Sequence, residues 1–366
     1  MHSLEEKIRK ICAYFRLEGE LASFDEIKMG NVNRTYLVRI RNAQGQEKPY
    51  MLQAVNTYVF RDPEGVMENI EHVTAHIKQK QSNLIPLHFH HTADGKNYIM
   101  EQDGFWRLFN FIPSITYNSC DDLQVVVNAG EAFGQFQMLL SDFDASRLHD
   151  TIPDFHNTKK RYETFEKHVA EDPCGKVGEA QKEIDWLLSV REKACALTDM
   201  HEKGLLPLRV THNDTTINNV LFDRKDHRAL AVIDLDTVMP GLVGHDFGDA
   251  IRFAANYVEE DSREADRAGV NMDVFNAFAQ GFLRHTAQAL TQQEIDTLPL
   301  SCFVLAAELA VRFLDDYIQG SPYFKINYPE HNLVRARCQI ALAQDMLKKE
   351  AEMQEAVRIC AARFRG

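Results

Sequence analysis

Two short segments of the sequence bring together side chains that could bind a metal ion and activate a hydroxyl group. The first, HNDTTINN, has His212, Asp214 and Asn219, and the second, VIDLD, has Asp234 and Asp236. Mg²⁺ prefers oxygen ligands, typically one or two carboxylates together with phosphates and water. An aspartate beside a substrate hydroxyl can orient it and accept its proton during phosphoryl transfer. The two segments therefore indicate a phosphoryl-transfer site, provided that the strands carrying them pair.

The same polar residues have a structural alternative, because Asp, Asn and Thr also cap turns between strands. The runs LRVTH, NVLFD and ALAVIDLD are short and rich in β-formers, so we expect extended segments joined by polar turns. Around them the apolar residues recur at helical spacing, in DLQVVVNAGEAFGQFQMLL, in EIDWLLSVREKACALTDMHEK and after Asp246. The candidate site is therefore predicted to lie on short strands within a mainly helical region.

Residues up to about 112 are predicted to form a sheet with one long helix. RTYLVRIRN and KPYMLQAVN flank the turn AQGQ in the pattern of a hairpin, and LIPLHFHH, KNYIMEQ and FWRLFNFI are further predicted strands. DPEGVMENIEHVTAHIKQK is predicted to be a helix capped by Asp62. Pro113 and a following Ser/Thr/Asn cluster end the last strand. We predict an α+β chain with two domains, residues 1–112 and 113–366.

Composition argues against several classes of partner. The chain has 41 Lys and Arg against 54 Asp and Glu, a net charge of −13, which disfavours nucleic acid and anionic membranes. The segment MHSLEEKIRKICAYF lacks the apolar run of a signal peptide, and CFVLAAELAVRFL is interrupted by Glu308 and Arg312. Seven scattered cysteines without a Cys-x-x-Cys pair are typical of reduced thiols. We expect a cytoplasmic enzyme, and the sequence does not give its oligomeric state.

The motif, its partner strand and the order of the two parts resemble the aminoglycoside phosphotransferase and choline kinase family over nearly the whole chain. This resemblance implies a bilobal protein-kinase-like fold, with a small antiparallel-sheet N-lobe that binds nucleotide and a mainly helical C-lobe. It implies ATP and Mg²⁺ as cofactors, Asp214 as the catalytic base beside the acceptor, and Asn219 and Asp234 as metal ligands. His212 is then a scaffold residue, and Asp236 either touches metal or substrate or caps a turn.

Four further stretches resemble one subgroup of this family, the N-acetylhexosamine 1-kinases, which phosphorylate the anomeric hydroxyl of N-acetylglucosamine and N-acetylgalactosamine. They are YMLQAVNTYVFRDPEGVMENI, FWRLFNFIP, HDFGDAIRF and LAVRFLDDYIQGSPYFK. We therefore expect such a sugar as the acceptor, without a preference between the two. The alternatives are a kinase of another small alcohol (choline, an aminoglycoside or homoserine) and an inactive member that binds nucleotide or sugar.

Candidate nucleotide contacts lie in the predicted sheet. Gly30, Asn31 and Asn33 precede the hairpin, where a close backbone approach would let amides meet phosphate oxygens. An ordinary tight turn explains these residues equally well. The adenine is expected against LFNFIP, with main-chain groups of residues 110–112, including Asn110 and Ile112, bonding its edge.

The strand YMLQAVN departs from the usual kinase pattern. Most kinases have a phosphate-pairing lysine here, and this sequence has Gln53. Either Gln53 makes a weaker contact with the phosphates, or a cation such as Arg34 or Arg61 supplies the charge. The missing lysine is the feature that supports an inactive nucleotide-binding protein.

The segment ELAVRFLDDYIQGSPYF, taken as a helix, supplies groups that suit a sugar. It places Glu308, Arg312 and Asp316 at helical separations of four residues. One interpretation is an internal Glu308–Arg312–Asp316 ion network. The other, implied by the subgroup resemblance, is that Arg312 binds sugar hydroxyls and Tyr323 closes the pocket.

A second acidic pair begins the helix predicted in GHDFGDAIR. Acidic residues are favoured at a helix N-terminus, so we expect Asp246 to cap this helix. Asp249 is expected to pair with Arg252 three residues later.

Overall fold

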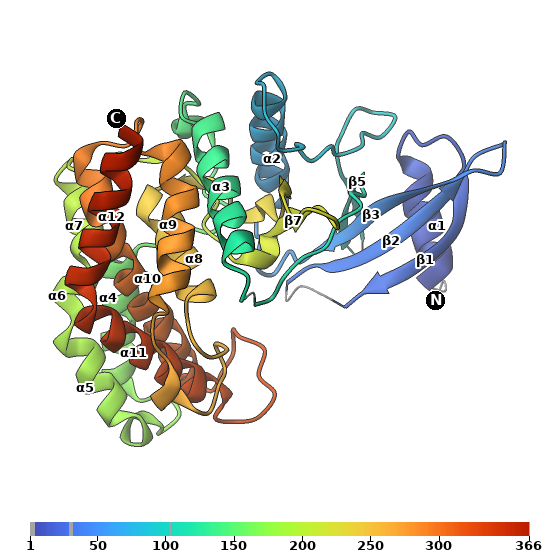
Figure 1. The fold of residues 1–366 in the computed structure, drawn as a ribbon. Helices are drawn as coiled ribbons and strands as arrows, with labels where there is room; N and C mark the ends of the chain where they lie inside the picture. The colour runs from blue at the N-terminus through green and yellow to red at the C-terminus, as the bar shows by residue number, and fades with distance from the viewer. Residues whose placement is uncertain (1–3, 29–31, 103, 120, 366) are drawn as a thin grey trace.

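The N-terminal part of the chain is built on a five-stranded antiparallel sheet of order β1-β2-β3-β5-β4. A computed structural model describes residues 4–28, 32–102, 104–119 and 121–365. The strands are β1 (Glu20–Ile27), β2 (Arg34–Arg41), β3 (Glu47–Val55), β4 (Ile99–Glu101) and β5 (Gly104–Asn110). Helix α1 (Leu4–Tyr14) packs on this sheet through Ile8, Ile11 and Cys12. The sheet and α1 form one end of an elongated molecule (Figure 1).

The predicted hairpin and the long helix are confirmed. Strands β2 and β3 pair from Arg34↔Ala54 to Arg41↔Glu47. Helix α2 (Pro63–Lys78) begins after Asp62, whose Oδ1 accepts a hydrogen bond from the Gly65 amide at 3.0 Å. The local patterns in this region therefore specify the local structure.

Two predictions for the sheet need correction. Strand β1 was not expected, because ELASFDEI alternates poorly between buried and exposed positions. LIPLHFHH, residues 84–91, does not form a strand. It lies beside β5, and a single antiparallel bridge pairs Phe89 with Phe109. Pro86 has no amide hydrogen, and the Ile85 amide donates to the carbonyl of Leu230, in the other part of the chain, instead of to β5.

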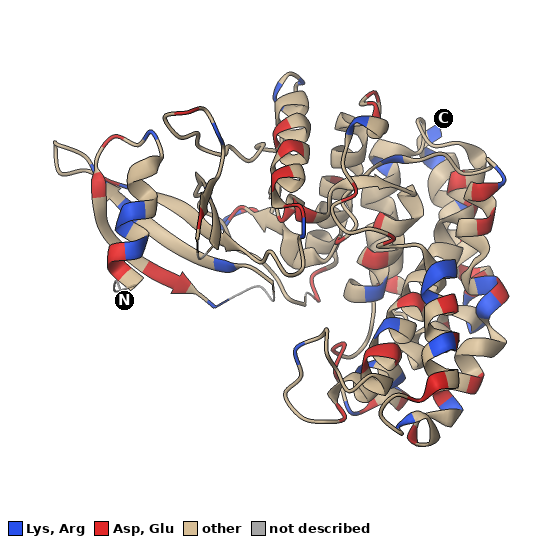
Figure 2. Ribbon diagram, turned by 180° about the vertical axis from the view of Figure 1, so that it is seen from behind, with Lys and Arg blue, Asp and Glu red and all other residues tan. Residues whose placement is uncertain are grey.

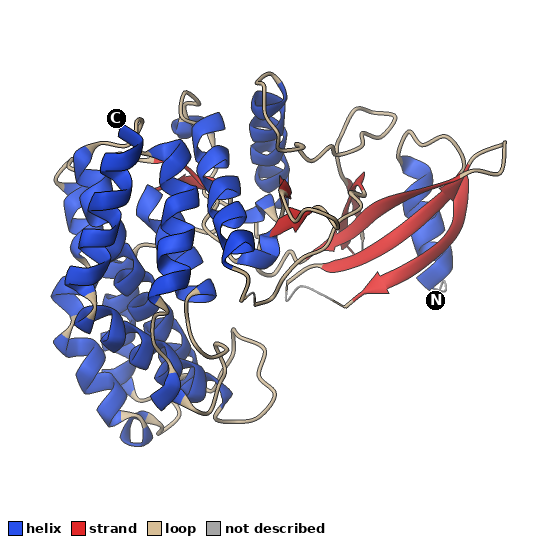
Figure 3. Ribbon diagram, in the orientation of Figure 1, coloured by secondary structure: helices blue, strands red, loops and turns tan. Residues whose placement is uncertain are grey.

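The remainder of the chain is mainly helical, with short strands between α7 and α8 (Figure 3). The helices are α3 (Leu123–Leu139), α4 (Thr158–Glu171), α5 (Gln181–Ser189), α6 (Arg191–Ala194), α7 (Ala196–Glu202), α8 (Val243–Ala254), α9 (Met272–Thr286), α10 (Gln292–Ile318), α11 (His331–Lys348) and α12 (Glu350–Arg365). The strands are β6 (Arg209–Thr211), β7 (Val220–Phe222), β8 (Ala229–Val232) and β9 (Met239–Gly241), and the 3₁₀ turns η3 (Ile217–Asn219) and η4 (Leu235–Thr237) follow the motif residues. The predicted extended segments within a helical region are therefore confirmed, and the fold is the bilobal protein-kinase-like fold.

The single helix expected over EIDWLLSVREKACALTDMHEK is wrong, because the segment forms α5, α6 and α7. The chain bends at Val190 and at Cys195, whose ψ angles are 4° and −4°. These tight turns let Leu187, Ala194 and Leu197 all face the core. Helical spacing is preserved within each piece but does not reveal the bends.

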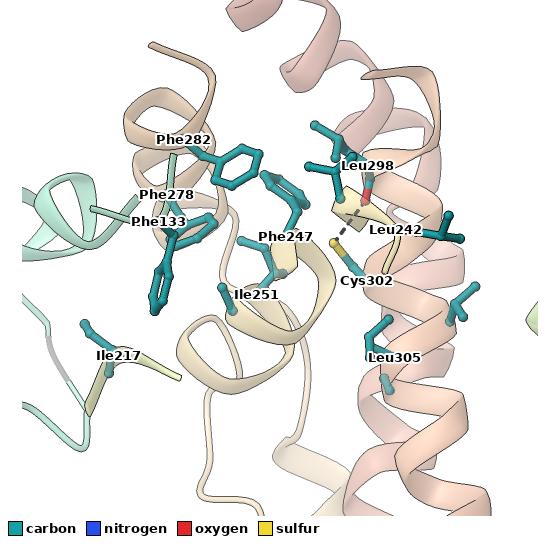
Figure 4. Close-up of a cluster of buried hydrophobic side chains, with 14 of the residues drawn as sticks. Phe133, Ile217, Leu242, Phe247, Ile251, Phe278, Phe282, Leu298, Cys302 and Leu305 are labelled. Carbon is teal, nitrogen blue, oxygen red and sulfur yellow. Dashed lines mark hydrogen bonds between the residues drawn. The ribbon is translucent and has the colours of Figure 1, made fainter. Parts of the chain in front are cut away.

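Helix α10 is the central helix of the core. It is long and apolar enough to cross a membrane by length and composition, yet 83% of its most apolar window is buried inside the protein. Leu298 and Cys302 of α10 lie on the side of Phe247 of α8, and the Phe247 ring packs in turn against Phe282 of α9 (Figure 4). Acidic and basic residues are interleaved on the outer helices, as expected for a solvated surface (Figure 2).

The two parts of the molecule share one hydrophobic core. Val55 and buried residues of α2 belong to the same cluster as the helices of the C-terminal part. Beyond β5, Ile115 bridges to Phe222 of β7. The boundary at residue 112 stays a prediction, and it falls just after the end of β5.

Helices α3 and α9 approach each other closely at glycines, which gives a stability prediction. A Cβ atom at Gly281 would lie 2.1 Å from the Val127 carbonyl oxygen, so Gly281→Ala forces the two backbones apart. We expect the free energy of unfolding, measured by urea denaturation, to fall by about 3 kcal/mol. A Cβ at Gly178 meets no atom within 4 Å, and Gly178→Ala is the matched control. Equal unfolding free energies for the two variants would contradict this packing.

Candidate active site

Strand pairing brings the two motif segments together. β7 and β8 are antiparallel, with Val220 opposite Val232, and the Ile233 amide donates to the Asn219 carbonyl at 2.9 Å. Asp234 then adopts a left-handed conformation, with φ 59° and ψ 55°. The Asn219 side-chain amide donates to the Asp214 carbonyl at 2.9 Å. Asp214, Asn219 and Asp234 therefore lie at one place, as the spacing predicts.

The loop around Asp214 is held by two buried carboxylates of α8. Asp246 accepts hydrogen bonds from the amides of His212 and Asn213 at 3.0 and 2.8 Å, and Asp249 accepts from the Thr215 amide at 2.9 Å. Asn213 is in the left-handed region, with φ 63°. These bonds flank Asp214 on both sides, so they fix the direction of its side chain.

The expected role of Asp246 as a cap of its own helix is therefore wrong. Its carboxylate is turned away from the α8 amides because the amides of a different segment, residues 212 and 213, lie within hydrogen-bonding distance. The pairing of Asp249 with Arg252 is confirmed, at 2.8 and 3.0 Å. A pattern along one helix could not reveal a partner from another segment.

His212 is a scaffold residue in the structure. Its Nε2 donates to the Ile233 carbonyl at 2.8 Å, and its Nδ1 accepts from the Asp214 amide at 3.3 Å. The rings of Phe133 and Phe136 contact the imidazole edge-on. Both ring nitrogens are thus engaged in positioning the backbone, in the neutral tautomer with the proton on Nε2.

Several carboxyl groups lie close together around Asp214 and Asp234. Desolvation raises the pKa of Asp214, and the Asp249 carboxylate raises it further, while Arg252 acts in the opposite direction. Desolvation likewise raises the pKa of Asp234, together with the carboxylates of Asp236 and Asp214. Desolvation and repulsion between carboxylates both disfavour the charged forms, and a bound cation would offset both.

The donor set fits Mg²⁺. Asn219 uses its amide nitrogen within the protein, which leaves its side-chain carbonyl oxygen for a ligand. The Asp234 carboxylate accepts no side-chain cap hydrogen bond from η4, and no other donor in the described residues bonds it, so its oxygens are left for a ligand. One carboxylate and one amide oxygen, completed by phosphates and water, match the usual coordination of Mg²⁺ by kinases.

Asp236 has a role that neither predicted option describes. It is buried, with 1% of its surface exposed, and its Oδ1 accepts from Arg107 Nη1 at 2.5 Å. Its Oδ2 accepts from the Asn33 side chain at 2.7 Å. Asp236 therefore joins the segment after β8, which carries Asp234, to the N-terminal sheet through an ion pair.

The residue at the position of the missing lysine is part of the same network. Gln53 Oε1 accepts from Nε and Nη2 of Arg107 at 3.0 and 2.8 Å, and Gln53 Nε2 donates to Thr35 at 3.0 Å. Arg34 and Arg61, the two cations considered from the sequence, are exposed at the start of β2 and before α2. Arg107 was not considered, although it lies directly opposite Gln53 in the β3–β5 register.

The other predicted nucleotide residues have mixed outcomes. Gly30 and Asn31 lie outside the described residues. Asn33 accepts from the Asn56 amide at 2.9 Å, in addition to its bond with Asp236. Its polar groups therefore hold the entry to β2, and contact with phosphate stays a prediction.

The expected adenine edge is only partly available. The Asn110 amide donates to the His88 carbonyl at 3.1 Å, and the Asn110 side chain bonds His90 at 2.8 Å. By contrast, the amides of Phe111 and Ile112 have no backbone acceptor within the described ranges. Among the described residues, the Ile112 amide therefore has no backbone partner, and it could donate to the edge of a base.

On the acceptor side, the predicted ion network Glu308–Arg312–Asp316 is wrong. Glu308 bonds His156 at 2.8 Å and Thr158 at 2.5 Å instead. Asp316 accepts from the backbone amides of Tyr323 and Phe324 and from Asn332, which shapes the turn after α10. Other polar groups satisfy both carboxylates, so neither is left to pair with Arg312.

Arg312 lies between two aromatic rings. Its guanidinium carbon is 5.1 Å from the Phe155 centroid and 5.6 Å from that of Phe324, and no carboxylate bonds it in the described part of the chain. Desolvation lowers the pKa of Arg312, and the neighbouring Arg161 contributes to this shift. Tyr323 is about half exposed and meets Phe324 edge-on at 4.9 Å.

His156 connects this region to the catalytic loop. Its Nδ1 bonds Glu308 on α10, and its Nε2 bonds the Asn213 carbonyl at 3.3 Å. Phe155, the residue before it, contacts Arg312. Arg312 and Asp214 are therefore linked through one short segment.

The fold and the site define a phosphotransferase. A model of the phosphotransferase enzyme family (APH) matches residues 23–285, and the chain belongs to this family. It is therefore a small-molecule kinase with a hydroxyl acceptor that uses ATP and Mg²⁺.

Solved structures share the fold at low sequence identity. An aminoglycoside phosphotransferase from Alicyclobacillus acidocaldarius is 12% identical, with a TM-score of 0.63 over 96% of each chain. A microcompartment-associated aminopropanol kinase is 15% identical, with a TM-score of 0.64 over 94% of this chain and 98% of that one. An amicoumacin kinase in complex with AMP-PNP, Ca²⁺ and Ami is 13% identical, with a TM-score of 0.61 over 93% of each chain.

Replacing the predicted base should separate activity from stability. We expect Asp214→Asn to lower kcat about 10²- to 10⁴-fold, because the acceptor proton loses its base. The melting temperature should stay equal or rise, because the raised pKa of Asp214 marks a carboxylate that is unfavourable in the folded state. Asp296→Asn, at an exposed position of α10, is the control. Turnover near that of the control would remove Asp214 from its assigned role.

Glu308 gives a prediction for acid stability. Burial alone would raise its pKa, but His156 and Thr158 lower it to about 2. A depressed folded-state pKa stabilises the protein above the ordinary value of 4.5, and this stability is lost as the pH falls toward 2. We expect the unfolding free energy of Glu308→Gln to change less steeply with pH across this window than that of the wild type. Parallel curves in acid titrations monitored by urea unfolding would refute the assignment.

Proposed function

We propose that this kinase transfers the γ-phosphoryl group of ATP to the anomeric hydroxyl of an N-acetylhexosamine, giving the sugar 1-phosphate. The observation that carries the proposal is Arg312, a guanidinium held between aromatic faces and without a carboxylate partner among the described residues. The four subgroup-like stretches of the sequence support the same acceptor.

The chemistry around Arg312 suits a neutral sugar. A guanidinium offers several N–H donors in a fixed plane, which can bond hydroxyl and acetamide oxygens. Phe155 and Phe324 hold the guanidinium through their ring faces, and the half-exposed Tyr323, edge-on to Phe324, offers an accessible ring that could cover the sugar. Cationic acceptors such as choline or an aminoglycoside would meet repulsion from Arg312 and the neighbouring Arg161. Homoserine carries a carboxylate that Arg312 could also bind, so it remains the alternative to test.

In the proposed reaction, Asp214 orients the acceptor hydroxyl and accepts its proton as the new O–P bond forms and the bond to the β-phosphate oxygen breaks. Asn219 and Asp234 would hold Mg²⁺, which neutralises phosphate charge when it is bound. The amides fixed by Asp246 and Asp249 keep Asp214 in place during transfer. The proposal assigns nucleotide binding to residues 1–112 and catalysis and acceptor binding to residues 113–366.

The proposal of an active enzyme is favoured over that of an inactive nucleotide-binding protein. The only feature that supports inactivity is Gln53, and the cation Arg107 lies directly beside it. Asp214, Asn219 and Asp234 are all present and close together. We also propose a cytoplasmic location, on the basis of the seven scattered cysteines, and no nucleic acid or membrane partner, on the basis of the net charge of −13.

An acceptor panel tests the substrate directly. The protein is incubated with labelled ATP, Mg²⁺ and N-acetylglucosamine, N-acetylgalactosamine, choline, an aminoglycoside or homoserine, and products are identified by mass. We expect phosphorylation of an N-acetylhexosamine, and loss of reducing-end reactivity shows that the anomeric position is modified. Phosphorylation of another acceptor, or of none, would overturn the proposal.

Arg312→Ala tests acceptor recognition at a single residue. We expect the KM for the sugar to rise about 10-fold or more, because hydrogen bonds to a charged group are lost, with the KM for ATP unchanged. The melting temperature should change little, because no carboxylate in the described residues is hydrogen-bonded to Arg312 and Glu308 keeps its bonds to His156 and Thr158. Arg337→Ala, which breaks a surface pair with Glu183, is the control. A large loss of stability with an unchanged sugar KM would show that Arg312 is only structural.

A further inference from the structure

Arg107 is a buried cation between the N-terminal sheet and the segment after β8 that carries Asp234 and Asp236. Its side chain is 2% exposed, as is that of its partner Asp236. It donates through Nε and Nη2 to Gln53 and through Nη1 to Asp236. Burial of a charged pair is costly unless geometry and hydrogen bonds are good, so a role beyond packing must be considered for this one.

The partners of Arg107 are the elements expected around a triphosphate. Asp236 follows Asp234, the predicted metal ligand, by two residues, and Asn33 at the entry to β2 bonds the other oxygen of Asp236. Gln53 stands on β3 where most kinases have the phosphate-pairing lysine. Arg107 is near enough to oppose the rise in the pKa of Asp234 that desolvation and the neighbouring carboxylates cause.

Gln53 suits a site in which the cation, Arg107, lies on β5 and not on the neighbouring strand β3. Gln53 lies directly opposite Arg107 on one side and Thr35 on the other. Its carbonyl oxygen accepts from Arg107, and its amide donates to Thr35. A lysine at this position would place a second cation against Arg107, which like-charge repulsion disfavours. The neutral amide is thus the residue that Arg107 requires.

We propose that Arg107 is the cation that positions the ATP phosphates in this protein, in place of the missing β3 lysine. Gln53 orients its guanidinium, and Asp236 ties it to the strand of the metal ligand. The inference rests on the ATP dependence of the family and does not depend on the identity of the acceptor.

The test compares the binding of MgATP and of adenosine, which has no phosphates, by calorimetry on the full-length chain. Arg107→Met should weaken MgATP binding at least about 10-fold, because the site loses the positive charge buried beside it, and leave adenosine binding within about twofold. Arg107→Met combined with Gln53→Lys returns the cation to β3 and should restore much of the MgATP affinity. The control Arg209→Met breaks another partly buried pair, with Glu294 at 2.6 Å, and should lower the melting temperature while leaving both affinities unchanged.

A second variant covers the case in which Arg107→Met does not fold. Gln53→Glu keeps the size of the side chain and adds a second carboxylate beside Arg107, which makes its group with Asp236 net negative, so MgATP affinity should fall while adenosine affinity and the fold are retained. The proposal is overturned if MgATP and adenosine lose affinity equally in these variants, if neither affinity changes, or if Gln53→Lys fails to restore binding in a folded double variant. Inactivity toward N-acetylhexosamines would contradict the proposed function and leave these binding results unaffected.

Discussion

The site depends on the bonds between the carboxylates of Asp246 and Asp249 and the backbone amides of the loop that carries Asp214. Both acids are buried, and their partners are the amides of residues 212, 213 and 215. Desolvation raises the pKa of Asp246, and the amide hydrogen bonds act against this shift. A loop with Asn213 in a left-handed conformation would otherwise have several conformations available, and these bonds select one.

The core then fixes these two acids in space. They lie on α8, which packs on α10 so closely that a Cβ at Gly248 would be 2.4 Å from the Ser301 carbonyl oxygen. Phe247, between them in the sequence, is buried among aromatic residues of α9. The direction of Asp214 is thus set by the rigid helices beneath it. At the N-terminal sheet, the Arg107–Asp236 pair connects β5 to the segment after β8 that carries Asp234.

Sequence patterns predicted the parts of this arrangement that depend on neighbouring residues. Alternation gave the β2–β3 hairpin, Asp62 gave the start of α2, and the motif spacing placed Asp214, Asn219 and Asp234 together. Local periodicity failed where a partner lies far along the chain. Asp246 was expected to cap its own helix, and an ion network was one of the two interpretations of Arg312. Both ideas came from pairing residues three or four positions apart along one helix.

Arg107 shows the same limit most clearly. It is 54 residues from Gln53, and only the β3–β5 register places the two opposite each other. Its carboxylate partner, Asp236, is 129 residues away in the other half of the molecule. The register could be inferred from the predicted strands once Gln53 was noted as a departure. The pairing with Asp236 requires the arrangement of the two halves, which no local pattern contains.

The most direct measurement is a crystal structure of the protein with Mg²⁺, a non-hydrolysable ATP analogue and N-acetylglucosamine. We expect Mg²⁺ to be bound by the oxygens of Asn219 and Asp234, with the Asp214 carboxylate facing the anomeric hydroxyl of the sugar. A triphosphate bound elsewhere, or Asp214 directed away from the acceptor, would contradict the account.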